Sequence, residues 1–404
     1  MLTDKTIFIF GIAKYDGQFE STSYTTAKFL AKDNDVYYID YPYTIKDYFN
    51  KRDDTFSKRQ KAFFSLDHCL ISTETARLKI LILPPLLSIN FLAEGPLYRF
   101  LLDVNEKIIV NRVKGVLKKI KVSQFVFINS HNFHYPNVGP KLNAKLSVYH
   151  CVDPLVIDYD RKHGVVSEAQ IVASSDVVIC TSRQLYREKL VHNVNTYFIP
   201  NAADITHSSK VLNEDLEIHP GLRDIPHPIV GYLGNIERRI DFDLLTKFAE
   251  DQTNTSLVLV GPVVEEYIPK GFRQLKNVYF IDRVPYEDMP SVVKGFDVAI
   301  IPFKKDEVSA TIFPLKLFEY LGSGKPTVLT DFNLDLMEFT GSSVFYCKDS
   351  LEFITAIKEC IDNDTLQARD LRVAIAKDHT WEKVLLQFST LLQEFYEKKN
   401  TISD

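Results

Sequence analysis

Residues 298–330 read VAIIPFKKDEVSATIFPLKLFEYLGSGKPTVLT and contain a complete strand–helix–strand pattern. The short apolar runs Val298–Ile301 and Thr327–Leu329 are typical of buried strands. Between them, Leu315–Leu321 has apolar residues at helical spacing, and the glycines that follow end this helix. Two strands joined by a helix predict a parallel pair with a crossover connection.

The same alternation of strands and helices extends along the rest of the chain. It is interrupted between about Asn201 and Pro228, where a polar, proline-rich stretch is expected of a linker or domain edge. Two successive alternations predict an α/β protein with two doubly wound domains, each on a parallel sheet covered on both faces. The other predicted strands are Ile7–Phe10, Val36–Ile39, Leu78–Leu83, Phe125–Ile128, Leu146–Tyr149, Val177–Ile179, Ile229–Leu233, Leu257–Val260 and Val278–Phe280.

Length and composition restrict the class of protein. The 404 residues suffice for two cores, and 45% hydrophobic with 25% charged residues is globular composition. A net charge of −5 argues against a nucleic-acid partner. The five scattered cysteines form no CxxC pair, which favours a reducing compartment over disulfides or a zinc site. The first residues lack the features of a signal peptide and no apolar run could span a bilayer, so we expect a cytoplasmic protein.

The loop and helix after Val298–Ile301 are the strongest candidate for a ligand site, because ligands bind beyond the carboxyl ends of strands in open α/β sheets. The sequence predicts a helix that starts near Phe313, with Pro314 in its first turn. Free amides at a helix N-terminus bind anions, and Lys316 adds positive charge there. Glu319 lies about one turn further along the same face and can accept hydrogen bonds from ribose hydroxyls. The alternative is a helix that is merely well capped.

The motif from Pro314 to Leu321 (PLKLFEYL), followed by Gly324-Lys325-Pro326, resembles the donor-site signature of GT-B glycosyltransferases. The similarity is greatest to bacterial enzymes that build capsules, teichuronic acids and exopolysaccharides (family 4-like). Further segments agree in order and spacing, and the resemblance covers most of the chain after about Ser147. These segments are DVVICTSRQL at 176–185, IPNAAD at 199–204, GYLGNIERRIDFDLL at 231–245, and the stretches 259–262, 284–290 and 297–303.

The resemblance implies two Rossmann-like domains facing each other across a cleft. It assigns 1–204 to acceptor binding and 205–380 to the nucleotide sugar, with a last helix in 381–404 that crosses back to the first domain. Apolar residues at helical spacing in Trp381–Lys399 agree with such a helix. The reaction implied is transfer of a sugar from a nucleotide diphosphate, by default uridine diphosphate (UDP), to a glycan or lipid-linked acceptor. It needs no metal and no cofactor besides the nucleotide sugar.

The resemblance also assigns donor-binding residues. Lys316 and the backbone of Phe313, Pro314 and Leu315 match the diphosphate contacts, and Glu319 matches the ribose-binding glutamate. The remaining matches are Gly234 and Asn235 near the phosphates and sugar, Arg238 or Arg239 as helpers, and Arg283 and Val284 beside the base.

One position departs from the family pattern. Many retaining members carry a sugar-side glutamate eight positions before the ribose-binding one, and here that position is Thr311. An inverting enzyme would need a general base for the acceptor hydroxyl. Candidates on loops after first-half strands are Asp153, the first choice, together with Asp16 and His131. For each aspartate, a capping or salt-bridged role is the alternative.

Two segments in the first half of the chain suggest an amphiphilic acceptor. Residues 78–102 are unusually apolar, with Pro84-Pro85-Leu86-Leu87 expected to be exposed, and residues 107–121 are basic without a compensating acid. A basic, partly apolar helix can lie on an anionic membrane surface, whereas the alternative is a core helix with a solvated lysine face. Two other functions remain open: a sugar-nucleotide epimerase, and a non-catalytic protein that binds a sugar nucleotide or glycan.

Overall fold

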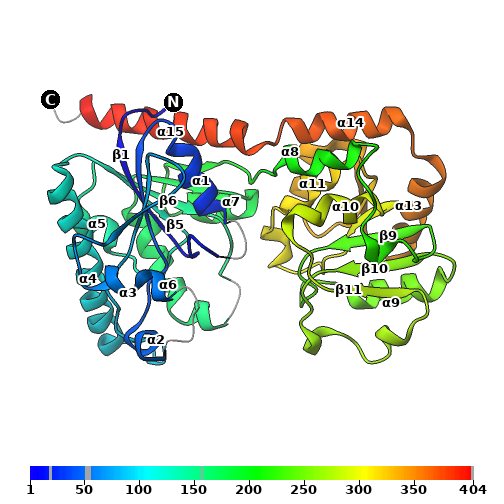
Figure 1. Ribbon diagram of the computed structural model, residues 1–404, viewed down its shortest axis with the longest axis horizontal. Helices are drawn as coiled ribbons and strands as arrows, with labels where there is room; N and C mark the ends of the chain where they lie inside the picture. Colours follow the sequence, from blue (N-terminus) through cyan, green and yellow to red (C-terminus); the bar gives the residue numbers. More distant parts are fainter. Residues whose placement is uncertain (18–20, 51–55, 156–157, 402–404) are drawn as a thin grey trace. The chain divides into compact units, whose positions relative to one another are not determined.

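The computed structural model describes residues 1–17, 21–50, 56–155 and 158–401, which form two compact units (Figure 1). Unit 1 comprises Met1–Pro200 and Val384–Asp404, and unit 2 comprises Asn201–Lys383. The sequence-based boundaries at 204 and 381 fall within a few residues of these divisions. Each unit contains one sheet with helices packed against it.

Unit 1 is built on an eight-stranded sheet in the order β3-β4-β2-β1-β5-β6-β7-β8. Every pair is parallel except β3 with β4. Its central strands are buried on both faces, which explains their nearly continuous apolar sequences. The strands are β1 (Thr6–Gly11), β2 (Asp35–Ile39), β3 (Leu70–Ser72), β4 (Leu78–Leu81), β5 (Val126–Ser130), β6 (Leu146–Cys151), β7 (Val177–Cys180) and β8 (Thr196–Phe198).

The last helix of the chain, α15 (Trp381–Thr401), packs on unit 1 over most of its length. The backbone amide of Leu2 donates to the hydroxyl of Ser389 at 3.0 Å, and Lys399 pairs with Asp176 at 2.6 Å. The amphipathic helix predicted at Trp381–Lys399 is thus confirmed. The other helices of unit 1 are α1 (Thr22–Leu30), α2 (Ile45–Asn50), α3 (Phe56–Phe63), α4 (Pro96–Ile120), α5 (Val138–Leu142), α6 (Asp158–Ser174) and α7 (Arg183–Leu190).

The structure corrects two expectations about residues 78–121. Leu86 is fully buried rather than exposed, because the segment Pro84–Leu87 bridges to Thr44 and packs into the core. The basic face of α4 does have compensating acids, because Lys107 pairs with Asp103 and Lys119 with Asp67. Among the described residues, no helix is both long and apolar enough to cross a membrane.

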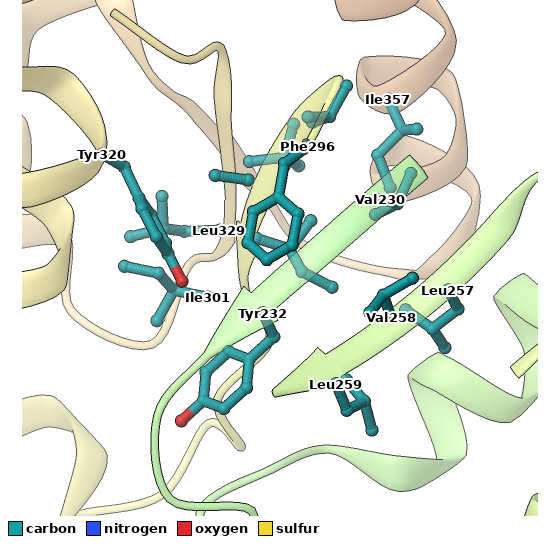
Figure 2. Packing of buried hydrophobic residues seen from close by; sticks show 14 of the residues in the cluster. Val230, Tyr232, Leu257, Val258, Leu259, Phe296, Ile301, Tyr320, Leu329 and Ile357 are labelled. Carbon is teal, nitrogen blue, oxygen red and sulfur yellow. The ribbon is translucent and has the colours of Figure 1, made fainter. Parts of the chain in front are cut away.

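Unit 2 is built on a six-stranded parallel sheet in the order β11-β10-β9-β12-β13-β14. Figure 2 shows its core, where the ring of Phe296 lies against the sheet among aliphatic side chains such as Val230 and Leu329. A Cβ at residue 231 would lie 2.2 Å from this ring, so only glycine fits there. The strands are β9 (Ile229–Leu233), β10 (Ser256–Val260), β11 (Val278–Ile281), β12 (Val298–Ile301), β13 (Thr327–Thr330) and β14 (Phe345–Cys347).

The helix of the candidate site, α11 (Leu315–Gly322), starts two residues later than predicted. Pro314 has an extended backbone (φ −76°, ψ 121°) and precedes the first turn as its capping residue. Steric conflict with the proline ring disfavours a helical conformation for Phe313, which explains the later start. The other helices of unit 2 are α8 (Ile205–Ser208), α9 (Phe242–Asp251), α10 (Met289–Lys294), α12 (Met337–Thr340), α13 (Ser350–Asn363) and α14 (Leu366–Lys377).

Candidate functional site

The predicted donor-binding residues of unit 2 gather at the carboxyl edge of its sheet. Gly234 and Asn235 follow β9, and Thr311 and α11 follow the neighbouring strand β12. Because β9, β10 and β12 are parallel neighbours, the loops that leave them share one edge. The candidate site is defined by close contacts between these loops and α11.

Lys316 is held in a defined position at this edge. Its ammonium group donates a hydrogen bond of 2.7 Å to the hydroxyl of Tyr232, which in turn donates to the backbone carbonyl of Asn235 at 3.0 Å. The same ammonium lies 4.1 Å from the centre of the Tyr232 ring, within cation–π range. The sequence pattern did not indicate a role for Tyr232, although a tyrosine so near the carboxyl end of a buried strand can place its hydroxyl at the edge where ligands bind.

The charge of Lys316 is poorly compensated. Among the described residues it forms no ion pair with a carboxylate. Burial, and then the nearby guanidinium of Arg239, lower the pKa of Lys316 to about 7, against the opposing effects of Glu319 and Glu237. An ammonium that is desolvated without a carboxylate is stabilised when an anion binds beside it.

Glu319 lies one turn after Lys316 on α11, and no described residue donates a hydrogen bond to its carboxylate. Burial raises the pKa of Glu319, and the negative charge of Asp204 raises it further, while Lys316 lowers it. An unsatisfied carboxylate in such a place can accept hydrogen bonds from ligand hydroxyls.

Two glycines allow the loops to approach α11 closely. Gly234 has φ +148°, and a Cβ there would lie 2.4 Å from the ammonium nitrogen of Lys316. Gly261, after β10, has φ +136°, and its Cβ would lie 2.2 Å from the carbonyl oxygen of Gly234. A side chain at Gly234 would therefore fill the space beside the Lys316 ammonium, and one at Gly261 would push the loop of Gly234 away.

The two arginines after β9 differ in their surroundings. Arg239 forms an ion pair with Glu237, and its guanidinium lies 5.5 Å from the centre of the Phe303 ring. Arg238 is 4.0 Å from the same glutamate. Because Arg239 also affects the pKa of Lys316, it is the arginine that the structure brings to the Lys316 group.

Two other predicted donor-site side chains, those of Phe313 and Thr311, make contacts within unit 2. Phe313 is buried and stacks on Phe318 with ring centres 5.4 Å apart, so it contributes only its backbone to the site. The Thr311 hydroxyl donates to the carbonyl of Val308 at 2.6 Å, within its own turn. Leu315 is the first residue of α11, so its backbone amide belongs to the first helical turn, where amides point out of the helix end.

The predicted base-binding pair follows β11, at the edge of the same sheet. Val284 is buried in the core of unit 2, whereas Arg283 is exposed. Of these two residues, Arg283 can therefore offer its guanidinium to a ligand, whereas Val284 can offer only its backbone.

In unit 1, His131 directly follows β5, and Asp153 follows the adjacent strand β6. His131 is buried, has a left-handed backbone (φ 58°), and its Nδ1 has no hydrogen-bond partner. Burial lowers the pKa of His131, and the charge of nearby Asp153 opposes this shift. Left-handed, buried histidines are uncommon, and such strained residues gather at functional sites.

Asp16 has a different environment. Its carboxylate accepts two hydrogen bonds from the buried Arg59, at 2.6 and 3.1 Å, and Arg59 also binds Asp40 at 2.6 Å. A carboxylate held in this way stabilises the buried arginine, and both of its oxygens are already engaged.

A buried cluster surrounds His131. Ligand-type atoms of His131, Cys151 and Glu168 lie within 4.8 Å of one another. The carboxylate of Glu168 already accepts hydrogen bonds from Tyr149 and Lys189, each at 2.7 Å. The lysine charge neutralises Glu168 and disfavours a metal cation beside it.

Comparisons with known proteins bear on the family and the fold of the chain. Residues 227–363 match the family model described as glycosyl transferases group 1. The chain is 24% identical over 245 residues to the putative teichuronic acid biosynthesis glycosyltransferase TuaH of Bacillus subtilis strain 168. This alignment covers 58% of the chain and 60% of TuaH, so it spans less than two thirds of that relative's length.

Solved structures resemble the chain over nearly its whole length. The sucrose-phosphate synthase of Thermosynechococcus elongatus matches with TM-score 0.69 at 14% identity, over 98% of this chain and 100% of that one. Anabaena HepE, solved with UDP and glucose, matches with TM-score 0.62 at 16% identity, over 96% and 100%. The α,α-trehalose-phosphate synthase of Burkholderia vietnamiensis matches with TM-score 0.70 at 8% identity, over 98% of each chain. Residues 227–363 are therefore similar to the group 1 glycosyl transferases, and the chain as a whole has the two-domain GT-B fold of these solved structures.

Proposed function

We propose that the protein is a glycosyltransferase that moves a sugar from a nucleotide diphosphate, UDP by default, to a glycan or lipid-linked acceptor in bacterial surface polysaccharide synthesis. The observation that carries this proposal is the pairing of Lys316 and Glu319 on α11, each without an ionic partner among the described residues. The likeness to TuaH supports the polysaccharide context, and the UDP bound to HepE supports the choice of nucleotide.

Each group in unit 2 has a proposed role toward the donor. The ammonium of Lys316 and the first-turn amides of α11 bind the diphosphate, because both present positive charge at the same edge. Glu319 accepts hydrogen bonds from the ribose hydroxyls. The charge that develops on the leaving diphosphate is then stabilised by groups already in place, so the reaction relies on alignment and electrostatics.

In unit 1 we propose that His131 accepts the proton of the acceptor hydroxyl. Its lowered pKa leaves the imidazole neutral at pH 7, and its Nδ1 is free of protein hydrogen bonds. Asp153, at the end of the adjacent strand, stabilises the imidazolium that forms. The ion pair with Arg59 makes Asp16 the weakest of the three candidates.

We further propose that a surface of unit 1 contacts the membrane that holds a lipid-linked acceptor. The segment 90–100 lies against α6, because Lys162 donates to the carbonyl of Phe91 at 3.3 Å and Arg99 to Ser167 at 2.9 Å. Here large apolar side chains are exposed on a surface we call the unit 1 patch: Phe91, Leu97, Phe100, Val165 and Val166. With Arg161 and Lys162 exposed beside it, the patch suits the headgroup region of an anionic membrane that holds a lipid-linked acceptor.

The reaction is tested by incubating the protein with UDP-sugars and a panel of glycan and lipid-linked acceptors, and measuring UDP release together with product mass. Acceptor-dependent UDP release is expected. Isomerised donor formed without acceptor would instead identify an epimerase, and donor binding with no turnover across the panel would identify a binding protein.

Co-sedimentation with vesicles of anionic lipid tests the membrane role of the unit 1 patch. The double variant Phe91→Ser, Phe100→Ser should remain in the supernatant. Absence of wild-type co-sedimentation would contradict the membrane role.

A further inference from the structure

Unit 2 contains a cavity of about 720 Å³ that lies away from the donor-binding residues. It is bounded by residues that precede three adjacent strands: Pro228 before β9, Asp297 before β12 and Pro326 before β13. Because these strands are parallel and the donor-site loops leave their carboxyl ends, the cavity lies at the opposite edge of the sheet. Its volume falls in the range of roughly 300–1,000 Å³ typical of small-molecule sites.

The last three residues of the family-like motif, Gly324-Lys325-Pro326, lie in the lining of this cavity. They are not part of the donor-binding group around Lys316. The ammonium of Lys325 donates to the carbonyl oxygens of Lys294 at 3.0 Å and Phe296 at 2.5 Å. Both partners are neutral, so the charge of Lys325 has no paired carboxylate among the described residues, and one N–H remains available.

Two further cations line the same cavity. The ammonium of Lys294 donates to the carbonyl oxygens of Asn213 at 2.7 Å and Glu214 at 3.0 Å, and it too has no carboxylate partner in the described chain. Arg369, on α14, has only a 3.4 Å contact with Asp370, which is long for a charge-assisted hydrogen bond. Most of its N–H groups are therefore available to a ligand.

The carboxylates of the lining are largely engaged elsewhere. Asp297 accepts hydrogen bonds of 2.6 Å from the amide of Ile229 and from the ring of His227. Asp364 accepts from Arg372 at 2.8 Å. Glu214 is the remaining acidic residue of the lining, and it is exposed. The lining thus holds three cations with spare donors and three carboxylates, and two of these carboxylates, Asp297 and Asp364, already accept hydrogen bonds from other groups.

We propose that this cavity binds a small phosphate-bearing molecule through Lys294, Lys325 and Arg369. Lysine ammonium groups act as point charges toward phosphate, and an arginine guanidinium can bind two of its oxygens at once. The cavity is much larger than one phosphate group, so the ligand is expected to carry an organic part, such as a sugar. The site does not depend on the function proposed for the donor-binding residues.

The test is calorimetric titration of the full chain at pH 7 and low salt, with glucose 6-phosphate as the probe and glucose as the uncharged control. Saturable binding of the phosphate and none of glucose are expected. Lys294→Ala and Arg369→Ala should each weaken binding about tenfold, equivalent to ~1.4 kcal/mol. Lys358→Ala, which removes an exposed lysine of α13 outside the lining, should bind like the wild type.

Lys316→Ala separates this cavity from the donor site. Retained glucose 6-phosphate binding in that variant is expected. The proposal is overturned if the wild type does not bind the probe, if glucose binds equally well, or if Lys294→Ala and Arg369→Ala both bind with wild-type affinity. It is also overturned if Lys316→Ala alone abolishes binding. The side chain of Arg369 is 44% exposed, so its removal is not expected to unfold the unit.

Discussion

The ammonium nitrogen of Lys316 lies 2.7 Å from the hydroxyl oxygen of Tyr232, and that hydroxyl donates onward to the carbonyl of Asn235. This relay fixes the position of a charge that has no carboxylate partner among the described residues. It also joins α11 to the loop after β9, so that two segments more than 80 residues apart meet at the proposed anion site.

The charge of Lys316 predicts how nucleotide binding depends on pH. Its pKa in the free protein is about 7, lowered mainly by burial, so the ammonium is present below that pH and is lost as pH rises. UDP binding needs the charged form and should weaken above pH 7, by up to tenfold per pH unit. Lys316→Arg, whose guanidinium stays charged, should bind with little change from pH 7 to 9. Titrations across this range in both proteins provide the check, and equal slopes would contradict the assignment.

Glu319 is predicted to recognise the ribose. The wild type should bind UDP about tenfold more tightly than 2′,3′-dideoxy-UDP, because the carboxylate is left unsatisfied by the second ligand. In Glu319→Ala the two affinities should become equal. Competition against a fluorescent nucleotide measures both. Discrimination that persists in the variant would show that another group reads the ribose.

Gly234 is predicted to matter both for the stability of unit 2 and for UDP binding. Gly234→Ala should lower stability by ~1–3 kcal/mol, because a side chain at φ +148° is strained, and should also weaken UDP binding because the new Cβ meets Lys316. Gly271→Ala is the matched control: φ is +90° there, but no heavy atom lies closer than 3.7 Å to the Cβ. It should lose stability and keep UDP affinity. Equal UDP affinity in both variants would exclude the contact with Lys316.

His131 and Asp16 are predicted to act differently. His131→Gln should reduce kcat about 10²- to 10⁴-fold while UDP binding is unchanged, as expected for loss of a general base. Asp16→Asn should lower stability, because it weakens the pair that neutralises the buried Arg59. Kinetics and thermal unfolding of the two variants distinguish the roles. An active His131→Gln protein would return Asp153 to first place.

The sequence predicted the sheets well because buried parallel strands have continuous apolar runs, such as Val298–Ile301 and Ile229–Leu233. The three-residue strands β3, β8 and β14 were missed, because so short a run has no distinctive periodicity. Lys316 and Glu319 were found from their spacing on one helix. Tyr232 was not, since its role depends on contact with a residue 84 positions away. Likewise, no local pattern could show that Leu86 is buried.

The most direct test of the central claim is thermal unfolding of the wild type, Lys316→Ala and Glu319→Ala with and without UDP. A ligand that binds only the folded state at 100 times its Kd stabilises it by ~2.7 kcal/mol. We predict that UDP raises the unfolding midpoint of the wild type and of the control Lys358→Ala. In the two α11 variants the same concentration should give a much smaller rise. Equal stabilisation of all four proteins by UDP would contradict the assignment of the nucleotide to the start of α11.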